Sequence, residues 1–285
     1  PKEDEVLIRV HASAVNSIDW RTRAGYLSGW WDYSLPLILG WDVSGVIEEV
    51  GSGVTQFKVG DAVYTLADFT RDGGYAEYIV VDASRISLKP TSISHVQAAA
   101  VPLAGLTAWQ ALFNTANLKA GEIVLIHGAS GEVGIFAVQF AKYKGAKVIG
   151  TTSSVNLKFL QKLGVDYVID YNTSKFEDIV GEVDVLLDTQ GKHTHKNSWQ
   201  VIKKDGILVS VVSKPSPEDA AINSVRAATS WVQYNTQELV EIAELIDAGK
   251  VIPIVDTILP LAEARQAHRQ IQHGQARGKI VLKII

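Results

Sequence analysis

The chain has 285 residues, of which 47% are hydrophobic and 20% are charged. It can bury a large core, and because single cores seldom grow beyond about 250–300 residues, two lobes are expected. The net charge of −4 comes without a block of Lys or Arg, which argues against nucleic acid or an anionic membrane as the main partner. The absence of cysteine excludes disulfides, zinc–thiolate sites and a cysteine nucleophile.

Two further features of the composition bear on localisation. The longest apolar stretch, residues 98–113, is interrupted by Pro102, Gly105 and Gln110 and is too short to span a membrane. The chain has no methionine, even at position 1, which suggests either a fragment of a longer chain or a sequence from which modified methionines are missing. The composition is compatible with a reducing cytoplasm, and we expect a cytoplasmic protein that binds neither membrane nor nucleic acid.

Short strands between glycine-rich corners predict an all-β lobe up to about residue 89. Helical patterns begin after Pro90, with Ser94 as the expected cap of a helix over 95–101 and a further helix over 106–117. The strands expected in this lobe are 6–11, 43–50, 62–65 and 75–81.

From residue 121, strands alternate with helices, a pattern that predicts a parallel, doubly wound sheet. Two helices follow, over 237–248 and 262–272, and then a final strand over 279–285 that has nowhere to pair except the first lobe. We therefore expect a catalytic lobe over 1–103, a nucleotide-binding lobe over 104–235 and a return to the first lobe over 236–285. The strands expected in the sheet are 124–127, 147–150, 167–169, 183–188, 207–212 and 225–233.

The segment 123–134 is the most informative part of the chain. An apolar run is followed by Gly128, Gly131 and Gly134, and helical apolar spacing continues over 135–142. This pattern predicts a buried strand, a tight glycine turn and a helix whose amino end holds the pyrophosphate of a dinucleotide. The spacing differs from the usual G-x-G-x-x-G.

The next strand bears on the choice of cofactor. In many NAD-binding folds an acidic residue roughly 20 residues after the glycine turn binds the adenosine ribose, and none stands there. Residues 151–158 instead offer hydroxyls, an amide and the ammonium of Lys158, which favour NADPH over NADH. An alternative is that Ser153, Ser154 and Asn156 cap a helix over 157–163, and the two roles are compatible.

Several motifs together resemble one family. They are AVNSID (14–19), GWDVSG (40–45), VGSGVTQFKVGD (50–61), GGYAEY (73–78), LTA (106–108), the glycine turn and ARGKIV (276–281). The chain resembles the medium-chain dehydrogenases/reductases, in the zinc-free NADPH:quinone oxidoreductase branch that includes the zeta-crystallin-like reductases. The resemblance implies an α/β protein with a GroES-like, β-rich catalytic domain, a Rossmann domain, NADPH as cofactor and a homodimer. The family's usual start is not matched, so an edge strand of the first lobe is expected to be missing.

The resemblance also bears on metal binding. In the zinc-dependent branch, the stretch that matches residues 40–42 carries a histidine ligand followed by a glutamate. Trp41 cannot bind a metal, and the cysteine ligands of that branch are absent. We therefore expect no metal, with the chemistry supplied by the cofactor.

The resemblance implies catalytic residues in the first lobe and on the helix that follows it. Asn16 and Asp19 would lie at the nicotinamide end, with Asn16 as an orienting or oxyanion-stabilising donor. Thr107 would face the nicotinamide, and Tyr64 or Tyr26 could relay a proton. The alternative for Asn16 and Asp19 is a local Asx turn after a strand.

The expected cofactor contacts fall into three groups. The resemblance implies Thr107, Ser130, Gly131, Glu132, Val133, Ser153, Lys158, Tyr171, Trp231, Val232, Gln233, Arg277 and Lys279. Thr152 and Ser154 join Ser153 at the end of the second strand. Gln190 and Val211 are included because ligands of doubly wound sheets collect at strand ends. Glu132 departs from the small residue of many relatives, and a carboxylate near phosphates is unfavourable unless it points to solvent.

Among the histidines, His193 and His195 form the closest pair. With no cysteine or acid beside them in the sequence, we expect them in a solvated loop rather than at a metal. His127 precedes the glycine turn and is expected to pack in the core.

The leading functional hypothesis is a reductase that transfers hydride from NADPH to a quinone. An alternative in the same class is an enone or alkenal double-bond reductase. An alternative of another class is an NADPH-binding protein with a structural or regulatory role and little turnover.

Overall fold

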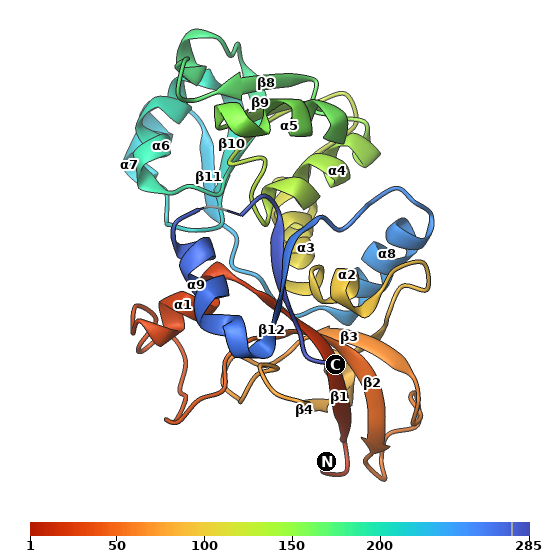
Figure 1. The fold of residues 1–285 in the computed structure, drawn as a ribbon. Coiled ribbons are helices and arrows are strands. Elements are labelled where there is room, and N and C mark those ends of the chain that lie inside the picture. Colours follow the sequence, from red (N-terminus) through yellow and green to blue (C-terminus); the bar gives the residue numbers. More distant parts are fainter. Residues whose placement is uncertain (275) are drawn as a thin grey trace. The chain divides into compact units, whose positions relative to one another are not determined.

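The computed structural model describes residues 1–274 and 276–285, which form two compact units (Figure 1). One unit consists of Pro1–Leu106 together with Tyr234–Ile285, and the other of Thr107–Gln233. The second unit is thus inserted into the chain of the first.

The first unit is built on a mixed sheet whose longest strand, β1, has three partners. Val6, Ile8, Val10, Ala12 and Ala14 alternate along β1 and are all fully buried, as a strand with one face on the core requires. The sheet has the order β12-β13-β1-β2-β3-β5, and β4 also pairs with β1. Its strands are β1 (Glu5–Val15), β2 (Asp42–Val50), β3 (Ala62–Leu66), β4 (Tyr78–Asp82), β5 (Ser87–Leu88), β12 (Val255–Pro260) and β13 (Lys279–Lys283).

The last strand returns to the first unit, as predicted from the sequence. β13 runs antiparallel to β1 over Ala12–Val15, with Val15 opposite Ile280. This pairing brings Lys279 to the carboxyl end of β1, next to Asn16. The expected strand over 75–81 starts later, at Tyr78, because the backbone N–H groups of Gly73 and Tyr75 bond to Ile38 and Leu39 in a neighbouring loop.

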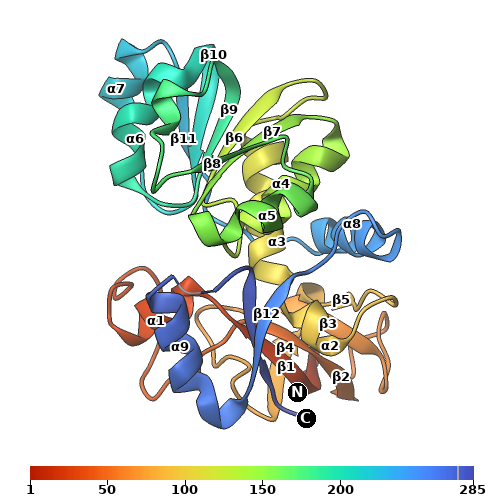
Figure 2. The same cartoon turned by 45° about the horizontal axis from the view of Figure 1, so that its top comes forward.

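The second unit contains a six-stranded parallel sheet in the order β11-β10-β9-β6-β7-β8. Right-handed crossovers place helices α4 and α5 on one face and α6 and α7 on the other (Figure 2). The predicted Rossmann-like sheet is therefore confirmed. Its strands are β6 (Ile123–His127), β7 (Lys147–Thr152), β8 (Tyr167–Asp170), β9 (Val183–Asp188), β10 (Ile202–Ser210) and β11 (Arg226–Thr229), and its helices are α4 (Gly134–Lys144), α5 (Leu157–Leu163), α6 (Lys192–Ser198) and α7 (Pro217–Ile222).

The remaining helices follow local sequence rules. Ser94 caps α2 and accepts a hydrogen bond from the N–H of Gln97, as predicted. The helix expected over 106–117 begins earlier, at Pro102, which suits the first turn of a helix, and its second half is a π-helical turn, Gln110–Thr115. These helices are α1 (Ser17–Arg23), α2 (His95–Ala99), α3 (Pro102–Trp109), α8 (Thr236–Asp247) and α9 (Ala264–Gln272).

The strand expected over 225–233 is shorter than predicted. β11 ends at Thr229, and the N–H of Ser230 makes one further bond to the carbonyl of Ser210. The backbone of Gln233 then bonds to the side chain of Gln110 instead of a neighbouring strand. Across residues 1–274 and 276–285, no helix combines the length and apolar content needed to cross a bilayer.

The carboxylate of Asp247 fastens the end of α8 to the loop before α2. It accepts hydrogen bonds from the N–H and hydroxyl of Thr91, both at 3.0 Å, and from those of Ser92, at 2.9 and 2.7 Å. Burial opposes the charge, but the hydrogen bonds from Ser92 and Thr91 outweigh it and lower the pKa of Asp247 to about 2.

Replacing Asp247 with Asn weakens these hydrogen bonds and should lower the free energy of unfolding at pH 7 by about 1–2 kcal/mol. The value should lie at the low end of this range because the site is exposed to solvent. The pKa of Asp247 is lower in the folded state than its value of about 4 in the unfolded chain. The ionised carboxylate therefore stabilises the fold above about pH 4, and this stabilisation is lost as the pH falls toward 2. The melting temperatures of wild type and Asp247→Asn should therefore converge between pH 5 and pH 2. Glu244→Gln on the same helix is the control. A difference that stays constant down to pH 2 would contradict this explanation.

Candidate functional site

The glycine turn at the end of β6 forms a close cradle. A Cβ atom on Gly134 would lie 2.3 Å from the carbonyl oxygen of Gly128, a contact that no side chain can make. Gly128 has a φ of +71°, and a Cβ there would lie 2.0 Å from the amide nitrogen of Gln190. A Cβ on Gly131 would meet Gly128 oxygen at 3.3 Å, so this position has more room. The turn thus requires glycine at its two ends, and it delivers the chain to the amino end of α4.

This turn lies where the order of the sheet reverses. β6 is followed by β7 and β8 on one side, whereas β9 lies on its other side, with His127 opposite Asp188. Doubly wound sheets bind their ligands at the carboxyl ends of the strands at such a reversal. The structure therefore brings together two predicted regions, the glycine turn and Gln190.

Hydroxyl groups from the glycine turn and from the end of β7 lie close together. The hydroxyls of Ser130 and Thr152 are 2.8 Å apart, and the amide of Asn156 donates to Ser130 and Ser153, each at 3.3 Å. In the described part of the chain, neither Ser153 nor Asn156 caps a helix with its side chain. The capping alternative is thus wrong for these two residues, and three predicted residues, Ser130, Thr152 and Ser153, lie together.

An acid that the sequence search missed lies beside this group. Asp170 ends β8 opposite Thr152, and it accepts a hydrogen bond from the hydroxyl of Ser154 at 2.5 Å and from the N–H of Asn172 at 3.0 Å. These bonds, first that from Ser154, lower the pKa of Asp170, so it is ionised at neutral pH. An acid was expected at the end of the strand that follows the glycine turn, whereas Asp170 lies at the end of the next strand, β8. Ser154 therefore faces a carboxylate and is a poor phosphate ligand.

The remaining predicted residues of the adenosine side lie at the surface. Lys158 is exposed on α5, and Tyr171 is 60% exposed after β8. Glu132 and Val133 are half-buried in the glycine turn before α4.

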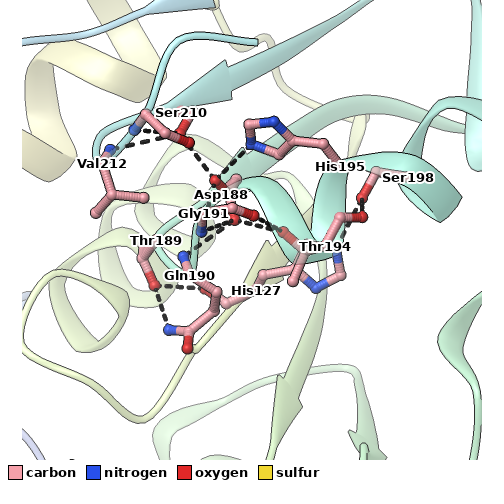
Figure 3. Close-up of polar contacts among 11 residues, drawn as sticks. His127, Asp188, Thr189, Gln190, Gly191, Thr194, His195, Ser198, Ser210 and Val212 are labelled. Carbon is pink, nitrogen blue, oxygen red and sulfur yellow. Dashed lines mark hydrogen bonds and ion pairs between the residues drawn. The ribbon is translucent and has the colours of Figure 1, made fainter. Parts of the chain in front are cut away.

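The end of β9 carries a buried polar cluster centred on Asp188 (Figure 3). Its carboxylate accepts hydrogen bonds from Ser210 at 2.8 Å, from the N–H groups of Gln190 at 3.0 Å and Gly191 at 3.1 Å, and from Thr194 at 2.8 Å. Burial opposes the charge of Asp188, but the hydrogen bonds, first that from His195, lower its pKa to about 2. An ionised Asp188 therefore holds the turn that contains Gln190.

The prediction for His195 was wrong. His195 lies on α6 with 6% of its surface exposed, and its Nε2 is 2.8 Å from the carboxylate of Asp188. The acid partner stands seven residues earlier, where the strand end and the first helical turn bring the two together. The prediction for His127 is confirmed, since it is buried against Phe176, and burial lowers its pKa to about 4.

The first unit holds a second buried polar cluster, formed by Asn16, Asp42 and Lys279, all fully buried. The side-chain nitrogen of Asn16 donates to Asp42 at 2.9 Å, and the ammonium of Lys279 donates to the side-chain oxygen of Asn16 and lies 3.5 Å from Asp42. Asp42 also accepts from the N–H of Leu103 on α3, at 2.7 Å. Burial raises the pKa of Asp42, while the charge of Lys279 opposes that rise.

This cluster changes the roles expected for Asn16 and Lys279. Both polar atoms of the Asn16 side chain are engaged within the protein, so it is not a free donor to a substrate. Lys279 is buried in an ion pair and cannot contact a cofactor. The sequence missed Asp42, although GWDVSG was one of the family motifs.

Asp19 is also fully buried, and it follows the local alternative. Its carboxylate accepts from the N–H of Asn16 at 2.7 Å, which closes the first turn of α1, and from the hydroxyl of Tyr75 at 2.9 Å. Burial raises the pKa of Asp19 to about 7 against the hydrogen bonds from Asn16 and Tyr75, which lower it. A buried helix-capping role therefore accounts for Asp19 without substrate contact.

The two candidate proton relays are placed differently. Tyr64 is fully buried and donates to the carbonyl of Leu239 at 2.5 Å, and burial raises its pKa. It therefore cannot exchange a proton with a substrate. Tyr26 is 70% exposed and packs edge-on against Trp20.

The remaining residues predicted for the cofactor lie in four regions. Thr107 is nearly buried on α3, Trp231 is 46% exposed and Val232 and Gln233 follow it after β11. Val211 directly follows β10, and its N–H donates to the carbonyl of Asp188 at 3.0 Å. Arg277, in the first unit, is exposed and lies 3.8 Å from Asp256. Among residues 1–274 and 276–285, no group of three His or acidic side chains could hold a metal ion.

Comparison with known proteins finds dehydrogenase families for both parts of the chain. Residues 2–91 match the family described as alcohol dehydrogenase GroES-like domain, and residues 163–282 match the family described as zinc-binding dehydrogenase. A solved structure titled as the quinone oxidoreductase of Coxiella burnetii superposes with a TM-score of 0.92 at 36% identity, over 100% of this chain and 92% of that one.

Whole-chain relatives carry related names. A mitochondrial NAD(P)H oxidoreductase of Mus musculus is 33% identical over 99% of this chain and 82% of its own length. The quinone oxidoreductase of Sus scrofa is 34% identical over 99% of this chain and 90% of its own. A chloroplastic NADPH-dependent alkenal/one oxidoreductase of Arabidopsis thaliana is also 34% identical, over 99% and 72%.

These matches confirm the predicted family and its cofactor class, since the relatives are named for NAD(P)H and the chain carries the family's nucleotide-binding domain. The GroES-like match confirms the expected character of the first unit. The chain belongs to the medium-chain dehydrogenase/reductase superfamily, in its zinc-free, quinone oxidoreductase-like branch.

Proposed function

We propose that this protein is a zinc-independent reductase that transfers hydride from NADPH to a quinone. The observation that carries the proposal is the glycine cradle at the reversal of the sheet, where the missing Cβ of Gly134 keeps the backbone open at the amino end of α4. The names of the quinone oxidoreductase relatives support the acceptor class. Trp41 at the position of a zinc-branch histidine supports independence from zinc.

In this proposal the second unit holds the cofactor. Bound NADPH supplies the hydride, so the chain needs only to bind the two reactants, orient them and exclude water. The phosphates are held by the amino end of α4, and Gln190 is fixed near them by Asp188. The residues of this unit proposed to hold NADPH are Thr107, Ser130, Gly131, Glu132, Val133, Thr152, Ser153, Lys158, Tyr171, Gln190, Val211, Trp231, Val232 and Gln233.

The preference for NADPH over NADH rests on the side chains near the end of β7. Ser153 and Lys158 offer a hydroxyl and an ammonium to a ribose phosphate. Asp170 is ionised and would repel a phosphate close to Ser154, to which its carboxylate is bonded. We therefore keep Ser153 and Lys158 in the proposed phosphate site and leave out Ser154.

Reduction of an enone is the second candidate. Relatives named alkenal/one oxidoreductase and 2-methylene-furan-3-one reductase support it, and the same hydride geometry serves both acceptors. A homodimer in the cytoplasm stays our expectation, to be tested by light scattering and by cell fractionation, since several relatives are named as mitochondrial or chloroplastic.

The decisive assay is the loss of NADPH absorbance with purified protein and a small quinone, a bulky quinone or an enone. Faster turnover with quinones, and much slower turnover with NADH, is the expected result. Faster turnover with the enone would favour the second candidate. Tight NADPH binding without turnover on any acceptor would favour a structural or regulatory role instead.

Gly131 and Gly134 should behave differently when they are replaced. The methyl group of Gly131→Ala would lie 3.3 Å from the carbonyl oxygen of Gly128, a tight contact that a shift of a few tenths of an ångström relieves, so the melting temperature should stay within a few degrees of wild type. That methyl would stand where phosphates approach, and the Kd for NADPH should rise about tenfold, which corresponds to about 1.4 kcal/mol. Gly134→Ala should fail to fold normally. Gly181→Ala, where a Cβ meets nothing within 4 Å, is the control. Unchanged NADPH affinity in Gly131→Ala would contradict the proposed cradle.

Lys158→Ala should raise the Kd for NADPH about tenfold through the loss of a charge-assisted contact, about 1–2 kcal/mol, and leave that for NADH unchanged. Lys162→Ala, on the same helix, is the matched control. Equal losses for both cofactors would remove Lys158 from the phosphate site.

The Asn16–Asp42–Lys279 cluster should matter for stability. Asp42→Asn leaves a buried ammonium without its counter-charge, so the free energy of unfolding should fall by about 3–5 kcal/mol. Glu48→Gln, which breaks the exposed ion pair with Arg9, should cost less than about 1 kcal/mol. Urea unfolding measures both values. A cost for Asp42→Asn no larger than that for Glu48→Gln would show that the ion pair does not stabilise the fold.

A further inference from the structure

Gln110 makes an unusual contact with the backbone of the inserted unit. It is the first residue of the π-helical turn and is 6% exposed. Its side-chain nitrogen donates to the carbonyl oxygen of Gln233 at 2.7 Å, and its side-chain oxygen accepts from the N–H of Gln233 at 2.8 Å. One side chain thus satisfies both backbone groups of one residue, as the neighbouring strand of a sheet would do.

The segment that Gln110 holds has just left the sheet. β11 ends at Thr229, and the next residue bonds once more to the sheet, through its N–H to the carbonyl of Ser210. The hydroxyl of Thr115, at the other end of the π-helical turn, lies 3.3 Å from that of Ser230. The π-helical turn therefore binds the segment 230–233 at both of its ends.

The π-helical geometry explains why one turn can make both contacts. Residues 110 and 115 lie on different faces of an ordinary α-helix, which has 3.6 residues per turn. The wider π turn, with bonds from residue i to i+5, brings them closer to one face. Thr107 stands three residues before Gln110 on the continuous helix, a spacing that places both on the same face. Such π-helical turns occur frequently at functional sites.

We infer that Gln110 is a positioning residue for the nicotinamide half of NADPH, holding Trp231, Val232 and Gln233 beside the helix that carries Thr107. The inference rests on the proposed function, which assigns those residues to the nicotinamide. Trp231 is 46% exposed and Gln233 is exposed, so the contact adds little to the burial of a core. Its effect is to fix the course of a segment that is no longer in the sheet.

The chain offers a matched control for Gln110. Gln139 lies in the same unit and is 8% exposed, but its side-chain nitrogen donates within its own helix, to the carbonyl of Ile135 at 3.0 Å. Gln139→Met and Gln110→Met thus remove similar polar groups from similar surroundings, and only the second releases Gln233.

The test compares two ligands by titration calorimetry, NADPH and 2′-phospho-ADP-ribose, which lacks the nicotinamide. Gln110→Met should raise the Kd for NADPH about tenfold and change that for 2′-phospho-ADP-ribose less than twofold. Gln139→Met should leave both unchanged. If Gln110→Met does not fold, Gln110→Glu serves instead, since its carboxylate keeps an acceptor for the N–H of Gln233 but sets an oxygen in place of the donor against the carbonyl of that residue. It should show the same selective loss.

Equal weakening of both ligands, or no weakening of either, would overturn the inference. Wild-type protein that binds 2′-phospho-ADP-ribose but gains nothing from the nicotinamide would also overturn it. Wild-type protein that binds neither ligand would instead contradict the proposed function, so the two failures are distinguishable.

Discussion

The close approach of Gly134 to the carbonyl oxygen of Gly128 is the constraint on which the nucleotide-binding unit depends. A contact of 2.3 Å to a Cβ is impossible, so only glycine lets the chain turn from β6 directly into α4. The turn places the amino end of α4 at the edge where β6 and β9 end side by side. An ionised Asp188 then orders the neighbouring turn, and Gln190 closes over Gly128. The pyrophosphate site is therefore prepared by backbone geometry more than by charged side chains.

In the first unit, buried polar side chains fix the ends of the strands. Its polar cluster ties together the end of β1, the start of β2 and the start of β13, which come from distant parts of the sequence. Asn16 bridges Asp42 and Lys279, and Asp42 also receives the N–H of Leu103 near the start of α3. These fully buried groups are paired with each other, so their role is to fix the ends of three strands and the start of the helix that leads to Thr107.

Much of the fold could be predicted from the sequence because its patterns are local. Alternating apolar residues predicted β1, and the apolar run before Gly128 predicted β6. The contacts that determine the surroundings of the site residues join residues that are distant in the sequence. Asp170 comes from the strand after the one searched, and His195 meets Asp188 only through the turn between β9 and α6. The burial of Asn16 and Lys279 depends on which residues of β1 and β13 lie opposite each other. The return of the last strand to the first lobe was predicted, but no local pattern sets this register between residues 263 positions apart.

The most direct test of the account is a crystal structure of the protein with NADP⁺. We expect the diphosphate to lie within hydrogen-bond distance of the backbone N–H groups of residues 131–134, and the 2′-phosphate to lie beside Ser153 and Lys158. A diphosphate bound away from the glycine turn, or a 2′-phosphate on the far side of Asp170, would contradict the central claim that the β6–α4 cradle holds the cofactor.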